Sequence, residues 1–182
     1  MIHEIQKSDS EYPAGLIARF GDCAPGKLNA IGDLNLLDLP MTAIFCSTRC
    51  PGDAILRAYD RAAKWRDEGR CVISGFHSPV EKECLRILLR GNQPIIICPA
   101  RSLIKMRIPT ELKRALAGNR LLILSFFSDK AHRATAESAQ RRNEFVAALA
   151  DENWFAHISP GGQMERIALQ VEKWGSRLSH EL

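Results

Sequence analysis

Small or polar residues follow each of five apolar segments of the chain, and arginines accompany two of them. Small residues allow main-chain N–H groups to approach an anion closely, and a helix N-terminus adds partial positive charge. Arginine adds charged, forked contacts to phosphate oxygens. In an open parallel sheet, ligands bind beyond the carboxyl ends of the strands. The pattern therefore predicts a phosphate-binding rim at these strand ends, although ordinary turns use the same residue types. The candidate residues are Ser47, Thr48, Arg49, Ser74, Gly75, His77, Ser78, Arg101, Ser125, Gly161 and Gly162.

Arg142 and Asn143 are candidates of a second kind, because they lie early in a predicted helix over residues 134–150. From that position both side chains can reach over the rim. The alternative is that they belong to a solvated face of the helix. Spacing alone leaves both interpretations open.

His77 and Glu81 are the weak catalytic candidates. A His–Glu pair can transfer protons near neutral pH. The alternatives are a loop histidine bonded to a neighbouring carboxylate, and a Glu81 that complements the dipole of its helix. The histidines show no metal-ligand spacing, and neither G-x-G-x-x-G after the first segment nor G-x-x-x-x-G-K-[ST] occurs. We therefore expect no metal, no cofactor and no standard dinucleotide enzyme or P-loop NTPase.

The charge of the chain is unevenly distributed. The formal net charge is +4, but residues 1–41 hold three Lys/Arg and six Asp/Glu, so the remainder is strongly basic. Residues 101–120 carry six Lys/Arg against Glu111 alone. Such an excess favours a phosphate-bearing partner. The alternative is a solvated basic face without a ligand.

The cysteines and the hydropathy pattern point to a cytoplasmic protein. The six cysteines form no C-x-x-C pair, and three lie inside apolar runs, which favours reduced, buried thiols. No apolar run approaches the roughly 18 residues of a membrane span. The first residues are polar and mixed in charge, so we expect no secretory signal and no membrane.

Apolar strands alternate with amphipathic helices from residue 42 onward. The fold class predicted is α/β, a Rossmann-like, open, doubly wound and mostly parallel sheet of about five core strands with helices on both faces. Residues 1–41 lack this alternation of strands and helices. They are predicted to be an N-terminal leader packed on a core domain of residues 42–178. The predicted strands are 42–46, 71–74, 94–98, 121–124 and 154–158. The predicted helices are 53–68, 79–90, 110–117, 134–150 and one that begins near residue 162.

Six short motifs, in this order, resemble the DNA-processing protein A family (DprA, also called Smf). They are Tyr12-Pro13, Gly32-Asp33-Leu34, Ser47-Thr48-Arg49 in place of Gly-Ser-Arg, Ser74-Gly75-Phe76, Leu124-Ser125 and Arg142-Asn143. The similarity covers roughly residues 12–162. It implies a Rossmann-like core that binds single-stranded DNA, and a recombinase partner. We expect a short, divergent member with this core only.

Two functions follow from these observations. The first is a non-enzymatic protein that binds single-stranded DNA, or another phosphate-bearing ligand, through the basic rim. The alternative is a nucleotide-binding sensor or phosphoribohydrolase-like enzyme that uses the same rim. The sequence leaves open DNA, RNA or small nucleotide, the recombinase partner and a homodimer.

Overall fold

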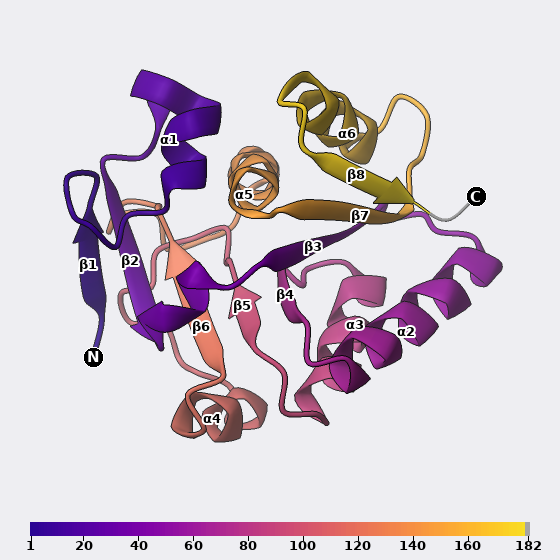
Figure 1. Ribbon diagram of the computed structural model, residues 1–182, viewed down its shortest axis with the longest axis horizontal. Coiled ribbons are helices and arrows are strands. Elements are labelled where there is room, and N and C mark those ends of the chain that lie inside the picture. Colours follow the sequence, from indigo (N-terminus) through magenta and orange to yellow (C-terminus); the bar gives the residue numbers. More distant parts are fainter. Residues whose placement is uncertain (181–182) are drawn as a thin grey trace.

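The fold is an eight-stranded sheet with helices on both faces (Figure 1). A computed structural model describes residues 1–180. The strand order is β1-β2-β6-β5-β4-β3-β7-β8; the run from β6 to β8 is parallel, while β1 and β2 are antiparallel to their neighbours. The predicted fold class is confirmed. The strands are β1 (His3–Gln6), β2 (Lys27–Gly32), β3 (Met41–Cys46), β4 (Cys71–Ser74), β5 (Ile95–Ile97), β6 (Leu121–Ser125), β7 (Glu152–His157) and β8 (Arg177–His180). The helices are α1 (Ala14–Phe20), α2 (Gly52–Asp67), α3 (Pro79–Leu89), α4 (Thr110–Ala117), α5 (Ala136–Leu149) and α6 (Gln163–Lys173), with 3-10 turns η1 (Gly21–Cys23) and η2 (Leu34–Asp38).

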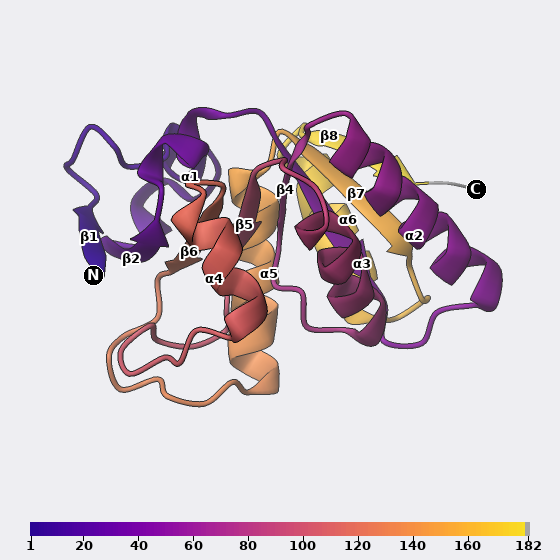
Figure 2. The ribbon, with the colours of Figure 1, turned by 90° about the horizontal axis from the view of Figure 1, so that it is seen from below.

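The sheet separates two apolar clusters, because successive side chains of a strand point to opposite faces. On β3, Ala43 and Phe45 pack toward α1, α5 and α6, whereas Ile44 and Cys46 pack toward α2, α3 and α4. Figure 2 shows α2, α3 and α4 in front of the sheet when it is seen from below. The loops at the strand ends therefore lie between two packed helix layers, one on each face of the sheet.

The five predicted core strands are present as β3 to β7, and three further strands extend the sheet. Residues 1–41, whose sequence lacks the alternation of strands and helices, supply β1 and β2, which extend the sheet beyond β6. The buried Tyr12, Leu16 and Leu28 of this segment belong to the same apolar cluster as α5 and α6. The third additional strand, β8, is a polar edge strand beside β7. β1 and β8 have four residues each, of which one is apolar, and β2 alternates Lys and Asn with its apolar residues, so none of the three forms a continuous apolar run.

The cysteines are all free, as the sequence predicted, and Cys46, Cys71, Cys84 and Cys98 are buried. Within residues 1–180, no helix is both long and apolar enough to cross a membrane. In the same residues, no group of three or more His, Cys, Asp or Glu side chains is placed to hold a metal ion.

Candidate nucleic-acid interface

Two adjoining hollows lie at the carboxyl ends of the parallel strands, where open α/β sheets bind ligands. The first, called the β3 hollow, has a volume of about 490 Å³ and is lined by the loop after β3 and by the starts of α3 and α6. The second, the β5 hollow, measures about 620 Å³ and lies between the loop after β5 and the start of α5. His77, Ala139 and Arg142 line both. Together the two hollows form the rim.

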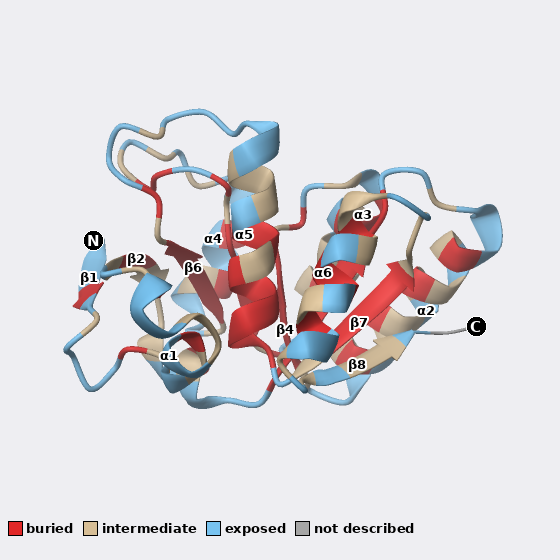
Figure 3. Cartoon of the chain, turned by 90° about the horizontal axis from the view of Figure 1, so that it is seen from above, coloured by how far each residue is buried: buried red, intermediate tan, exposed pale blue. Residues whose placement is uncertain are grey.

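Most of the predicted rim residues are brought together here. Figure 3 shows α5 exposed at the end that meets the neighbouring loops and buried along its second half. Ser74, Ser125 and Gly161 are the predicted residues that line neither hollow. The β3 hollow takes Ser47, Thr48, Arg49, His77, Ser78, Arg142, Asn143 and Gly162, and the β5 hollow takes Gly75, His77, Arg101 and Arg142.

Arg142 is buried, so of the two interpretations left open by the sequence the solvated helix face does not hold for this side chain. Its Nη1 donates to the carbonyl of Cys98 at 3.1 Å, and its Nε donates to Asn143 Oδ1 at 2.7 Å. The guanidinium lies against Gly75, where any Cβ would overlap it. Burial lowers the pKa of Arg142, and the nearby Glu81 carboxylate opposes that shift. The side chain is thus a fixed cation between the two hollows.

Glu81 is a buried helix cap, and the geometry contradicts the proton-transfer pair with His77. The Oε2 atom of Glu81 accepts from the main-chain N–H groups of His77 at 2.9 Å and Ser78 at 3.2 Å. Its Oε1 accepts from the Cys46 N–H at 3.2 Å. The Ser78 hydroxyl accepts from the Glu81 N–H, which completes a capping box. The carboxylate is thus engaged by main-chain donors, while the His77 side chain is exposed.

A second carboxylate of the chain occupies the start of α6. Gly161, at a positive φ of 70°, donates its N–H to Glu165 Oε2 at 2.8 Å. The main-chain N–H groups of His77, Ser78 and Gly161, which the sequence assigned to a phosphate, therefore already donate to Glu81 and Glu165. The sequence carries a signal for these contacts, because Glu81 follows Ser78 by three residues and Glu165 follows Gly161 by four.

Ser74 and Ser125, two of the predicted rim residues, form hydrogen bonds that hold neighbouring loops in place. Ser74 Oγ donates to the Ile44 carbonyl at 2.9 Å and accepts from the Phe76 N–H at 3.2 Å. Ser125 Oγ likewise donates to the Arg101 carbonyl at 2.7 Å. Both side chains are buried, so they position the loops and are not free to contact a ligand.

The cationic lining of the rim comes from four separate segments. Arg49 follows β3, Arg101 follows β5, Arg133 precedes α5, and Arg142 lies within it. Sequence reasoning did not single out Arg133 or its neighbour His132, although the run Lys130-Ala-His-Arg133 is a visible basic signal. Among the residues of 1–180 that line the two hollows, Glu81 is the sole carboxylate.

The basic segment 101–120 does not act as one surface. Arg101 lines the β5 hollow, whereas Arg120 lies at the opposite ends of the strands. There Arg120 Nη2 donates to the Leu89 carbonyl at 2.9 Å, which helps to end α3. The part of the segment that reaches the rim is therefore Arg101.

Comparison with known proteins agrees with this architecture. Residues 3–155 match the family model described as DNA recombination-mediator protein A. The chain belongs to this family. No curated protein matches the chain.

Solved structures of the same family share the fold. DNA processing protein A (DprA) from Streptococcus pneumoniae superposes with a TM-score of 0.81 at 19% identity, over 98% of this chain and 62% of that one. The chain thus spans about three fifths of the length of the pneumococcal protein. DNA processing protein A from Helicobacter pylori, described for its single-stranded DNA binding mode, gives 0.78 at 21% identity, over 99% and 80% of the two chains. A molybdenum cofactor binding protein from Rippkaea orientalis shares the fold more distantly, at 0.56 and 10% identity over 78% and 76%.

Proposed function

We propose that this protein binds single-stranded DNA along the rim and catalyses no reaction there. The observation that carries the proposal is the lining of the two adjoining hollows. It contains four arginines from four segments and one carboxylate, Glu81, which already accepts main-chain hydrogen bonds. A DNA strand carries a charge at each nucleotide, so cations spread along a concave path suit it better than one deep pocket does.

The path runs from the β3 hollow past Arg142 into the β5 hollow. Arg49 lies at the first end, and Arg101 and Arg133 lie at the second. The buried Arg142 supplies a rigid cation where the two hollows meet. A strand in this path has its backbone near four guanidinium groups. Arg49, Arg101 and Arg133 can make forked contacts with phosphate oxygens, whereas the buried Arg142 contributes its positive charge. Family membership and the DNA-binding relative from Helicobacter pylori support the same assignment.

A mononucleotide is the second candidate ligand. The β3 hollow, at about 490 Å³, falls within the size range of small-molecule sites. A sensor of this kind needs the β3 hollow alone, whereas a DNA strand needs both. Substitution of a residue that lines only the β5 hollow should therefore weaken the binding of a DNA strand and leave the binding of a mononucleotide unchanged.

Fluorescence anisotropy with a labelled oligonucleotide tests the proposal. Binding to a single strand should weaken with salt, with a slope of log K against log salt of about −3 for four phosphate contacts. Arg49→Ala and Arg101→Ala should each weaken binding by about ten-fold. Lys113→Ala, which removes an exposed cation of α4, should leave the affinity unchanged.

Two results would contradict the DNA assignment. One is a flat salt dependence or equal losses in all three variants, which would indicate diffuse attraction without a defined path. The other is tight binding of a mononucleotide that depends on Arg49 and is indifferent to Arg101. That second pattern would favour a nucleotide sensor.

A further inference from the structure

Ser47 and Ser159 join the loop after β3 to the loop after β7, beside the β3 hollow. The Ser47 Oγ atom accepts a hydrogen bond from the Ser159 main-chain N–H at 3.0 Å. The Ser159 Oγ atom donates to the Arg49 carbonyl at 3.3 Å. Each serine side chain therefore contributes one hydrogen bond between the two loops. We call these two contacts the serine clamp.

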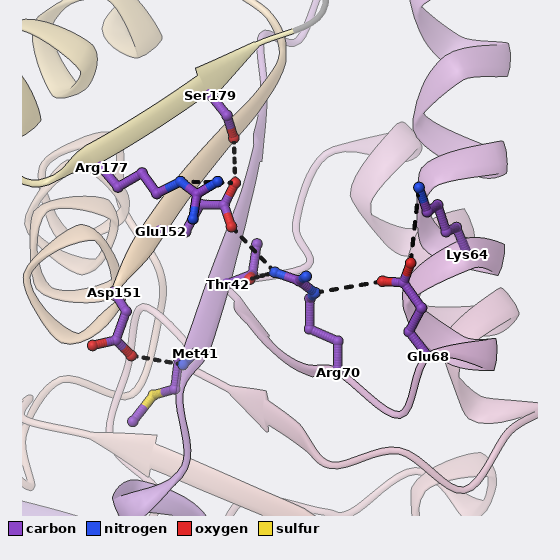
Figure 4. A network of polar contacts seen from close by, with 9 residues as sticks. All are labelled: Met41, Thr42, Lys64, Glu68, Arg70, Asp151, Glu152, Arg177 and Ser179. Carbon is purple, nitrogen blue, oxygen red and sulfur yellow. Dashed lines mark hydrogen bonds and ion pairs between the residues drawn. The ribbon is translucent and has the colours of Figure 1, made fainter.

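The strand pair β3 and β7 is held by side chains at its amino ends as well, as Figure 4 shows. There the Asp151 Oδ2 atom accepts from the Met41 N–H at 2.7 Å. The Arg70 guanidinium donates to Thr42 Oγ1 and to Glu152 Oε2, both at 3.1 Å. This network lies at the opposite edge of the sheet from the rim, so other contacts must hold the loops at the carboxyl ends.

Arg49 depends on these loop contacts, because its own side chain is not held. The residue is exposed, and within residues 1–180 no hydrogen bond or ion pair engages its guanidinium. Two residues earlier, the Ser47 N–H donates to the His157 carbonyl at 3.1 Å. Beyond that bond, Ser159 holds the main chain of Arg49. A loop that is already ordered loses less conformational freedom when it binds, so the clamp should favour binding.

We propose that Ser47 and Ser159 are positioning residues, which hold the backbone of Arg49 where its guanidinium can reach a phosphate in the β3 hollow. Both serines and the arginine line that hollow, and Ser47 is buried. The inference rests on the proposed DNA binding and deepens it. The role of Ser47 thereby changes from a phosphate ligand to a support of the neighbouring arginine.

Amide hydrogen exchange, measured by NMR without DNA, tests the clamp itself. In Ser47→Ala the Ser159 amide loses its acceptor, so its exchange should be about ten-fold faster than in the wild type. Ser179→Ala is the matched control, because it removes a serine bond to Glu152 at the other edge of the sheet and should leave the Ser159 amide unchanged. Equal exchange of that amide in Ser47→Ala and the wild type would overturn the proposal.

Fluorescence anisotropy with a single-stranded oligonucleotide tests what the clamp does for binding. Ser159→Ala, at a less buried position than Ser47, should weaken the affinity about three- to ten-fold at constant salt, and Ser159→Thr, which keeps the hydroxyl, should restore it. Because Ser159 acts through Arg49, Ser159→Ala should cause no further loss in an Arg49→Ala background. Ser179→Ala should leave the affinity unchanged.

The outcomes separate this inference from the proposed function. An equal loss from Ser159→Ala in both backgrounds would show that Ser159 contacts the DNA itself, and would overturn the positioning role. If Arg49→Ala weakens binding and Ser159→Ala does not, the DNA path stands and the positioning role is overturned. If Arg49→Ala binds the oligonucleotide as well as the wild type does, the proposed path fails at the β3 hollow, and the positioning role fails with it.

Discussion

Arg142 and Gly75 depend on each other, because the guanidinium occupies the space that any larger residue at position 75 would need. A glycine at this strand end therefore permits a buried cation, and its backbone freedom is not the reason for its presence. The sequence predicted that Gly75 lets a main-chain N–H group approach an anion, and that role stays a prediction. The sequence could not identify the side chain that fills the space, since Arg142 lies 67 residues further along the chain.

Gly75→Ala is expected to displace the Arg142 side chain. The overpacking should lower the free energy of unfolding by about 1–3 kcal/mol and weaken DNA binding as well. Urea unfolding and anisotropy measure the two effects. Gly52→Ala is the matched control, because a Cβ at position 52 meets nothing within 4 Å. A Gly75→Ala protein with unchanged stability and affinity would show that Arg142 is not held as described.

Helix starts are the elements at which prediction from sequence was least complete. The five predicted helices are present because their apolar residues recur at helical spacing, and α4 matches its predicted range, residues 110–117. The short helix α1 was not predicted. For the starts of α3 and α6 the sequence predicted a bound phosphate, and a Glu81 that complements the dipole of α3 was the alternative. Glu81 and Glu165 satisfy donors that sequence reasoning assigned to a ligand. The sequence around a helix start cannot show whether its N–H groups bind a carboxylate of the chain or a phosphate of a ligand, because both are acceptors for the same donors.

The strands show a related limit. The five predicted strands are present because continuous apolar runs reveal strands that are covered on both faces. The edge strand β8 has the sequence Arg-Leu-Ser-His and offers one apolar residue, so nothing in its composition marks it as a strand. Pairing with β7 creates it, and pairing is a tertiary property.

Glu81→Gln tests the role of this residue as a cap of α3. The neutral amide replaces one acceptor oxygen with a donor, so the variant should lose about 1–3 kcal/mol of stability. Glu83→Gln removes the same charge from the same helix at a less buried position and should change stability by less than about 0.5 kcal/mol. Chemical denaturation provides the comparison. Neither the wild type nor the variant should release base from a nucleoside monophosphate; turnover by the wild type that Glu81→Gln abolishes would restore the catalytic interpretation.

For the molecule as a whole, the buried thiols predict destabilisation at alkaline pH. Burial raises the pKa of Cys71, Cys84 and Cys98 to about 12, against about 8.5 for a free thiol. Between these values the folded state binds more protons than the unfolded state does. The stability is therefore fully present below about pH 8.5 and falls as the pH rises, by up to about 1.4 kcal/mol per pH unit for each thiol.

Urea unfolding under reducing conditions at pH 7, 9 and 10 measures this slope. Cys84→Ala removes one buried thiol and should make the decline between pH 9 and pH 10 less steep. Cys23→Ala removes an exposed thiol and should leave the decline as it is in the wild type. Equal slopes in all three proteins would assign the alkaline loss to other groups.

The pairing of β2 with β6 sets an order of events during synthesis. Asn29 pairs with Ser125, so β2 leaves the ribosome well before its neighbour exists. At about 5–20 residues per second, the interval is roughly 5–20 s. Throughout this interval, the edge of β2 that later pairs with β6 is open to other nascent chains. Slow codons between residues 33 and 120 should therefore reduce the yield of folded protein more than slow codons after residue 157 do, as measured by the aggregated fraction after expression.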